Sequence, residues 1–273
     1  MIRMLRPKSH FLIMGNESDA KLVSALVRGI TVLQCFSNKR QELSGAELVE
    51  MTGLPKPTLF RLADTLCELG LLRYSERLSK YVPGLGLLQL SSPVLSRLTL
   101  RQFARTQMVD LANYMGGQIQ LGVGNGRQLV LVELANGMGN RVFTPEIGVK
   151  ISLSRTATGR AYLLGLPEAE RTAFMDELRA RDAERAAQLQ ERLEDAQRDL
   201  QEHGFCRSHG DLHREILSIA VPMSHRIDGE SWVFGASVPS YNPKSKELET
   251  DIGPRLITLV RAVEGVLGAS SLS

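Results

Sequence analysis

Several residue types and motifs are scarce in this 273-residue chain, and each scarcity excludes a class of protein. Three widely spaced cysteines are too few for a disulfide framework or a four-thiolate zinc site. No apolar run approaches the ~20 residues that cross a bilayer, so we expect no membrane segment and no membrane partner. The chain holds no G-x-S-x-G, P-loop or H-E-x-x-H motif, which predicts a protein that is not an enzyme and needs no cofactor.

Charge is distributed unevenly along the chain, although the net charge is only +3. Residues 1–98 carry 13 Lys and Arg against 8 Asp and Glu, whereas residues 99–273 carry 20 against 22. A basic first third favours a nucleic-acid-binding N-terminal domain, called the head below, joined to a second domain with a different function. Aromatic residues make up only 5% of the chain, and their scarcity in the head argues against a stacking surface for single strands or RNA.

The first residues of the chain do not fit a secretory signal. Residues 1–20 have basic side chains and a short apolar run without a cleavage site, so we predict a disordered leader and a cytoplasmic protein. Residues 21–37 then repeat apolar side chains at intervals of three and four, which predicts a helix. Ser44 and Glu47 have the spacing of a capping box and predict the start of a second helix.

A third helix and a hairpin complete the pattern of the head. Pro57 suits the first turn of a helix, and Gly70 supplies a left-handed stop after Leu69. The polar turn between residues 71–74 and 80–82 predicts a two-stranded hairpin. The order of helix, helix, turn, helix and hairpin predicts a winged helix-turn-helix over residues 21–84.

The third helix has two chemically different faces. Apolar side chains recur along one face, which suits packing on the other helices, while polar and basic side chains recur along the other, which suits the major groove. Basic side chains on the hairpin suit contacts with flanking phosphates. The alternative is a small helical domain with ordinary solvated charges. The residues expected to contact DNA are Lys56, Thr58, Arg61, Thr65, Arg73, Arg77 and Lys80.

The rest of the chain reads as a linker helix at residues 85–98 and a second domain at residues 99–273. Alternating strands and amphipathic helices predict an α+β domain with an antiparallel sheet. After a helix at 99–115, the expected strands are 118–123, 128–134, 141–144, 150–153, 216–223 and 232–239, with helices at 159–166, at 167–203 (broken near 181–182) and at 246–268.

Five segments together resemble one known family. The runs LPKPTLFRLADTLCELGLLRY (54–74) and KYVPGLGLLQLS (80–91) resemble the recognition helix and wing of the IclR-type bacterial transcriptional regulators. The runs TATGRA (156–161), EILSIAVPM (215–223) and FGASVPS (234–240) resemble motifs of the second domain of that family. The order and spacing of the segments cover nearly the whole chain.

The resemblance implies a sequence-specific regulator whose affinity for a double-stranded DNA operator is set by a small-molecule effector. The second domain is then GAF-like and binds a small organic or aromatic acid, and the protein is a homodimer or a dimer of dimers. Pro57 and Phe60 replace the Ser and His that are common in the DNA-facing stretch, so no operator sequence is predicted. The effector-binding residues implied are Ala157, Thr158, His209, Ser218 and Ser237.

The chemistry of these positions suits an anion, because a helix that starts near Thr158 offers free N–H groups and the two serines offer hydroxyls. The alternative is that the serines satisfy local backbone groups. A different function is indicated by His209, Asp211 and His213, which would point the same way on an extended strand and could bind a metal for hydrolysis. A polar loop that leads into the strand at Ile216 is the alternative interpretation of that segment.

Overall fold

The computed structural model describes residues 22–124, 126–138 and 145–270. The predicted leader, Asn125 of the expected Asn125–Gly126 turn and the expected strand at 141–144 lie outside the described residues. The chain forms two compact units that divide between Arg97 and Leu98, and each is described by itself.

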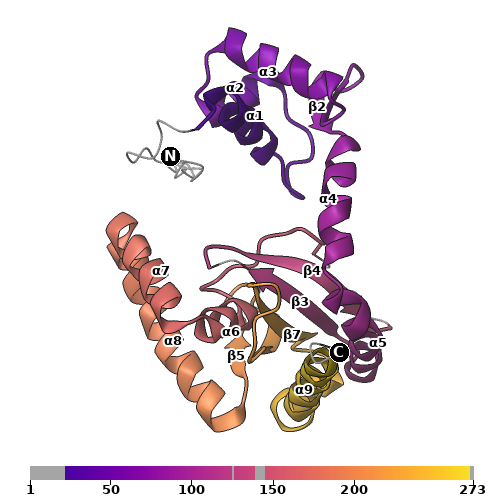
Figure 1. The fold of residues 1–273 in the computed structure, drawn as a ribbon, viewed down its shortest axis with the longest axis vertical. Helices are drawn as coiled ribbons and strands as arrows, with labels where there is room; N and C mark the ends of the chain where they lie inside the picture. Colours follow the sequence, from indigo (N-terminus) through magenta and orange to yellow (C-terminus); the bar gives the residue numbers. More distant parts are fainter. Residues whose placement is uncertain (1–21, 125, 139–144, 271–273) are drawn as a thin grey trace. The chain divides into compact units, whose positions relative to one another are not determined.

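The N-terminal unit is a three-helix cluster with a two-stranded antiparallel wing (Figure 1). Its core lies where the three helices meet the wing and contains Val32, Leu48, Leu59 and Leu72. In chain order its elements are α1 Ser24–Gln34, α2 Gly45–Thr52, α3 Lys56–Glu68, β1 Leu72–Ser75, β2 Lys80–Pro83 and α4 Gly86–Arg97.

Local signals explain where these helices begin and end. The Ser44 hydroxyl accepts a hydrogen bond from the Glu47 N–H, and the Glu47 carboxylate accepts one from the Ser44 N–H at 2.8 Å, which completes the predicted capping box. Gly53 ends α2 with a φ of +67°, and Gly70 follows α3 with the same φ. Other residues rarely adopt this left-handed conformation, so glycine sets both ends.

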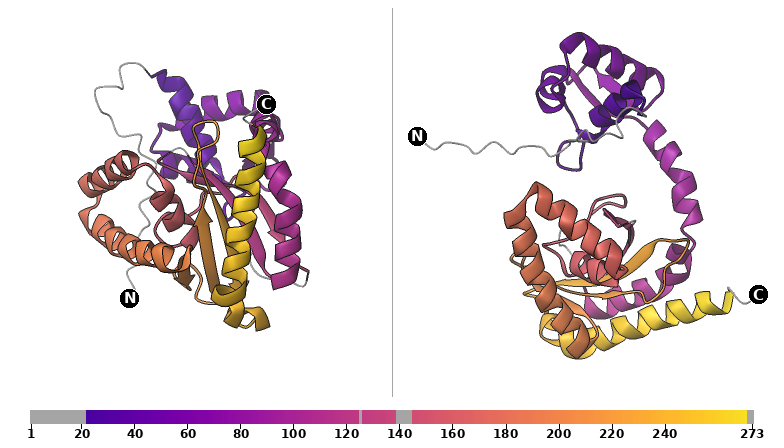
Figure 2. Two further views of the ribbon diagram at one scale, coloured as in Figure 1. Left: turned by 60° about the horizontal axis from the view of Figure 1, so that its bottom comes forward. Right: turned by 60° about the vertical axis from the view of Figure 1, so that its left-hand side comes forward.

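The C-terminal unit is built on one five-stranded antiparallel sheet in the order β4-β3-β7-β6-β5 (Figures 1 and 2). Its elements are α5 Leu100–Met115, β3 Gln118–Gly124, β4 Leu129–Asn136, α6 Ala157–Gly165, α7 Glu168–Arg181, α8 Ala183–His203, β5 Cys206–His209, β6 Ile216–Pro222, β7 Ser231–Pro239, a 3-10 turn Pro243–Glu247, a π turn Leu248–Ile252 and α9 Gly253–Ser270.

Helices cover both faces of this sheet (Figure 2). One face packs against α5 and α9 through a large apolar core that includes Met108, Ile119 and Phe234. The other face packs against α6, with α7 and α8 outside it, through a second core that includes Tyr162 and Val233. This architecture confirms the predicted α+β fold. In the described part of the chain, no helix has both the length and the hydropathy of a membrane span.

Three elements differ from the sequence-based expectation. Residues 150–153 form no strand: Lys150 makes a bridge to Val130 and the Ile151 N–H donates to the Leu129 carbonyl, and the chain then turns away from β4. The closing helix was expected from residue 246, but its α-helical part begins at Gly253 after the 3-10 and π turns. The strand β5 was not expected, because four residues are too few for a periodic signal.

Candidate functional site

The recognition helix α3 is divided into a buried and an exposed face. Leu59, Ala63 and Leu66 are buried against the rest of the unit, whereas Arg61 and Thr65 are exposed. The Thr65 hydroxyl donates a hydrogen bond to the Arg61 carbonyl at 2.9 Å. Thr58 is half-buried in the first turn and Lys56 is exposed at the start of the helix. The exposed face of α3 therefore presents a cationic side chain and hydroxyls to solvent.

Phe60 lies away from the exposed face, in contrast to its expected place in the DNA-facing stretch. It is half-buried and packs on α2, where a Cβ at Gly45 would come within 2.8 Å of the Phe60 ring. The ammonium of Lys56 lies 5.9 Å from the centre of the same ring. Gly45 and Phe60 therefore set the distance between the two helices of the motif, and this contact covers part of the ring.

The wing places the predicted basic residues at its surface. Strand β1 pairs with β2 in a register that joins Arg73 to Val82 and Tyr74 to Tyr81. The two tyrosine rings meet edge to face at 5.1 Å, which fixes the hairpin. Arg73 and Arg77 are exposed and Lys80 is half-buried.

A row of polar side chains crosses the sheet of the C-terminal unit at one level. Ser208 on β5 pairs with Ser218 on β6, Ser218 pairs with Ser237 on β7, and Ser237 pairs with Gln118 on β3. Directly paired residues share a face of the sheet, so these four side chains lie side by side. All four line a single cavity of about 140 Å³. The sequence singled out Ser218 and Ser237, while strand register adds the other two.

The ionisable side chains that line this cavity, among the described residues, are all basic. Apolar side chains such as Leu131 and Ile216 form part of the wall, and Lys150, Arg155 and His213 bring basic groups. Among the described residues that line it there is no Asp or Glu. Lys150 and Arg155 were not singled out from the sequence, although their nearness to the TATGRA run is a signal that could have identified them.

The first turn of α6 closes the cavity from above the sheet. Thr156 caps the helix by accepting a hydrogen bond from the Gly159 N–H at 2.9 Å, and both Thr156 and Thr158 line the cavity. Thr158 lies so close to β7 that a Cβ at Gly235 would come within 2.4 Å of its hydroxyl oxygen. Ala157 is fully buried in the apolar core. The positive end of the helix therefore lies at the cavity.

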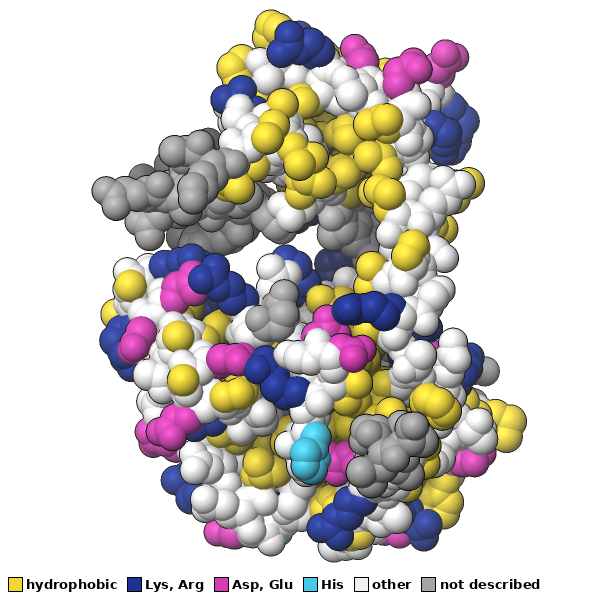
Figure 3. Space-filling model, viewed as in Figure 1, with side chains coloured by type: hydrophobic (Ala, Val, Ile, Leu, Met, Phe, Trp, Pro, Cys, Tyr) yellow, Lys and Arg dark blue, Asp and Glu magenta, His cyan; other side chains and the backbone are white. Residues whose placement is uncertain are grey.

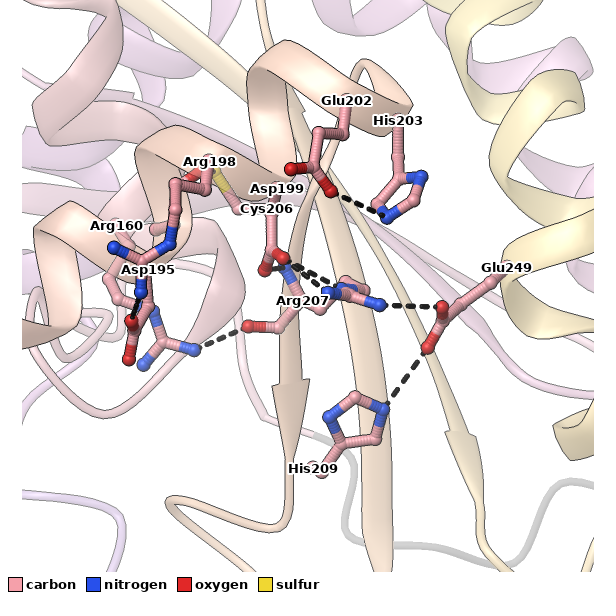
Figure 4. A network of polar contacts seen from close by, with 11 residues as sticks. Arg160, Asp195, Arg198, Asp199, Glu202, His203, Cys206, Arg207, His209 and Glu249 are labelled. Carbon is pink, nitrogen blue, oxygen red and sulfur yellow. Dashed lines mark hydrogen bonds and ion pairs between the residues drawn. The ribbon is translucent and has the colours of Figure 1, made fainter.

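His209 lies in a neighbouring polar cavity of about 590 Å³ and does not line the first one. Figure 4 shows Arg207 between Asp199 and Glu249. The Nε2 of His209 lies 3.1 Å from the Glu249 carboxylate. Burial raises the pKa of Glu249, but the hydrogen bond and charge of Arg207, with a smaller contribution from His209, outweigh it and lower the pKa. Glu249 therefore stays charged and joins β5 to the π turn.

The metal set of the alternative hydrolase interpretation is not assembled. Gly210, with a φ of +87°, turns the chain directly after β5, so His209, Asp211 and His213 do not extend along one strand. Asp211 instead accepts hydrogen bonds from Arg160 at 2.8 Å and Ser208 at 2.9 Å. Although burial raises the pKa of Asp211, these two partners lower it overall. Within the described ranges, no three His, Cys, Asp or Glu side chains are grouped to hold a metal ion.

Comparison with known proteins identifies both units. A profile described as "IclR helix-turn-helix domain" matches residues 25–76, and one described as "Bacterial transcriptional regulator IclR C-terminal" matches residues 92–262. The HTH-type transcriptional regulator TsaQ1/TsaQ2 of Comamonas testosteroni is 30% identical over 256 residues, which cover 93% of this chain and 92% of that protein.

Solved structures agree with this assignment. An IclR family transcriptional regulator from Brucella abortus is 35% identical with a TM-score of 0.78, over 93% of this chain and 96% of that one. An IclR homolog from Microbacterium hydrocarbonoxydans, complexed with 4-hydroxybenzoate, shares the fold at 20% identity and a TM-score of 0.64, over 87% of this chain and 99% of that one. The chain therefore belongs to the IclR family of bacterial transcriptional regulators, which combine a DNA-binding helix-turn-helix with an effector-binding C-terminal domain.

Proposed function

We propose that this protein binds a two-fold symmetric DNA operator through α3 and the wing, and that a small organic anion in the cavity of the C-terminal unit changes its affinity for that operator. The protein acts in the cytoplasm as a regulator and not as an enzyme. The observation that carries the proposal is the cavity itself: hydroxyls, amides and cations line it, and none of the described lining residues is acidic. A negative charge in such a cavity meets attraction without repulsion.

The size of the cavity supports a ligand with about one ring. Its volume of about 140 Å³ is close to the ~150 Å³ of an engineered protein cavity that binds benzene. The apolar wall at Leu131 and Ile216 suits the body of such a ligand, and the polar row and the end of α6 suit its acidic group. The Microbacterium relative, which holds 4-hydroxybenzoate, is consistent with this class of ligand.

The DNA side of the proposal assigns different tasks to the basic residues. Arg61 is exposed on α3 and has the length and donors for a bidentate contact with guanine, while Thr58 and Thr65 offer hydroxyls nearby. The arginines of the wing and Lys80 suit phosphate contacts. One recognition helix reads only a few base pairs, so two copies are needed for a specific site.

Arg155 provides the test of the ligand class. Its side chain forms no hydrogen bond or ion pair with the residues that the structure describes, and its guanidinium can pair with a carboxylate in two parallel hydrogen bonds. We expect benzoate to raise the melting temperature of the wild-type protein and neutral benzamide to have a smaller effect. Arg155→Gln should weaken benzoate binding by ~10-fold or more and leave benzamide binding unchanged.

Arg185→Gln is the matched control, because Arg185 lies near Arg155 in an adjoining cavity but does not line the ligand cavity. It should bind benzoate as the wild-type protein does. Benzamide binding as tight as benzoate, or a panel of aromatic and aliphatic acids in which none shifts the melting temperature or the operator affinity, would refute the proposed ligand class.

A further inference from the structure

A carboxylate is buried where the sheet meets the first turns of α5. The side chain of Glu133 on β4 is only 4% exposed, and its two oxygens lie 3.1 Å from Arg101 and 2.5 Å from Arg105. The Leu134 N–H also donates to it at 3.2 Å. The two arginines stand one turn apart on α5, so a single carboxylate fixes both the position and the rotation of the start of that helix.

A β-bulge in β4 explains why two side chains that are two residues apart point to opposite faces of the sheet. Leu121 pairs with Glu133 and Gly122 pairs with Leu131, so Val132 is the extra residue. In a regular strand Leu131 and Glu133 would point to the same face. The bulge instead lets Leu131 line the ligand cavity while Glu133 meets α5 on the opposite face of the sheet. The ion pairs therefore lie two residues from a wall of the cavity.

The position of α5 in the chain gives this contact a consequence. Helix α5 begins at Leu100, three residues after α4 ends at Arg97, and α4 belongs to the DNA-binding unit. A shift in the first turn of α5 is therefore passed directly to the chain that enters that unit. Burying a carboxylate is costly even when it is paired, and its best attested use is to specify one arrangement.

We propose that Glu133 is a positioning residue that couples the ligand cavity to the linker: it does not contact the ligand, but it ties the bulge beside Leu131 to Arg101 and Arg105. This inference rests on the proposed function, because it concerns how the ligand changes operator affinity. A ligand against Leu131 moves the bulge, and the buried ion pairs transfer that movement to α5.

The test compares Glu133→Gln and Arg105→Gln with Arg198→Gln in the full chain. Arg105 is 61% exposed, so its substitution keeps the test valid if Glu133→Gln does not fold. Arg198 is similarly exposed and, among the residues that the structure describes, forms an ion pair with Asp195 on its own helix. Allosteric effects are typically ~5- to 150-fold. In the first two variants the change in operator affinity caused by benzoate should fall below ~2-fold, while benzoate affinity and unliganded operator affinity stay within ~3-fold of wild type.

A second measurement does not depend on any ligand. Amide hydrogen exchange at residues 98–106 and 129–134 should be ~10-fold faster in Glu133→Gln and Arg105→Gln, and unchanged in Arg198→Gln. Unchanged exchange in the first two variants would overturn the positioning role, as would a full benzoate response in both. If wild-type protein itself ignores benzoate and the wider acid panel, the proposed ligand fails, and the exchange result alone decides the role of Glu133.

Discussion

At the scale of single residues, the arginines differ in whether their guanidinium groups already have hydrogen-bond partners within the protein. Arg160 is 5% exposed and donates to Asp211, the Ser154 carbonyl and the Arg207 carbonyl, so it is committed to holding the fold. Arg61 is exposed, and its guanidinium has no hydrogen bond with the described residues. Such a cation exchanges only water, and no protein partner, for a base or phosphate, which distinguishes Arg61 as an interaction residue.

Arg61→Ala should weaken specific operator binding by ~1–3 kcal/mol and spare nonspecific binding. Arg77→Ala on the wing should weaken both kinds of binding alike and reduce the slope of log affinity against log salt by ~1. Titrations of operator and scrambled DNA at several salt concentrations measure both effects. An equal loss on the two DNAs for Arg61→Ala would make Arg61 a phosphate contact.

At the scale of elements, α2 is a short helix whose position depends on its cap and on its contact with α3. Eight residues are too few for a helix to be stable alone. The capping box at Ser44 satisfies its first N–H groups, and the Phe60 ring on Gly45 holds it against the recognition helix. A weakened cap should therefore loosen the whole helix-turn-helix.

Ser44→Ala should destabilise the N-terminal unit by about 1 kcal/mol near pH 7. The side-chain and backbone hydrogen bonds of Ser44 lower the pKa of Glu47, outweighing the small effect of burial, and the charge of Lys80 adds to the lowering. The stability from Glu47 is therefore complete above the pKa of an unfolded Glu and is lost as the pH falls through the lowered value. Urea unfolding followed by circular dichroism from pH 7 to pH 3 measures the difference in unfolding free energy between wild type and Ser44→Ala. If this difference does not become smaller at acid pH, the Glu47 carboxylate does not contribute to the cap.

At the scale of the whole molecule, the N-terminal unit has exposed apolar surface on and beside α4. No residue of α4 is buried, and Leu85, Leu88, Leu90 and Val94 are each more than half exposed. Figure 3 shows further hydrophobic side chains gathered on this unit. On α1, Leu26 is also exposed. Most helical stability in proteins comes from packing an apolar face, so α4 needs a cover. A second copy of the chain, which the proposed two-fold operator requires, would supply such a cover and also the symmetry of a palindromic operator.

The double variant Leu88→Glu with Val94→Glu should separate the two copies, because charges would then be buried in the contact. Sedimentation should show a smaller assembly, and operator affinity should fall on the order of 100-fold or more as the two heads bind independently. Tyr241→Glu, at an equally exposed apolar residue of the other unit, should change neither result. A double variant that keeps its size would place the contact elsewhere.

The sequence by itself determined the elements of the head and much of the second domain. Caps, glycine stops and apolar periodicity act within a few residues, so the order of helices and the wing followed from Ser44, Gly70 and the spacing around them. The serines 218 and 237 were also identified from short motifs, and the structure puts them side by side in one cavity.

Only the tertiary structure decided which residues share a site. Ser208 and Gln118 join the polar row through strand register, and the bulge at Val132 sends Leu131 and Glu133 to opposite faces. His209, the last residue of β5, lines a different cavity from the one that the family resemblance implied. The physical reason is that a site on a sheet is assembled by hydrogen bonds between strands that are far apart in the chain. A local sequence pattern does not specify which strand pairs with it or in which register.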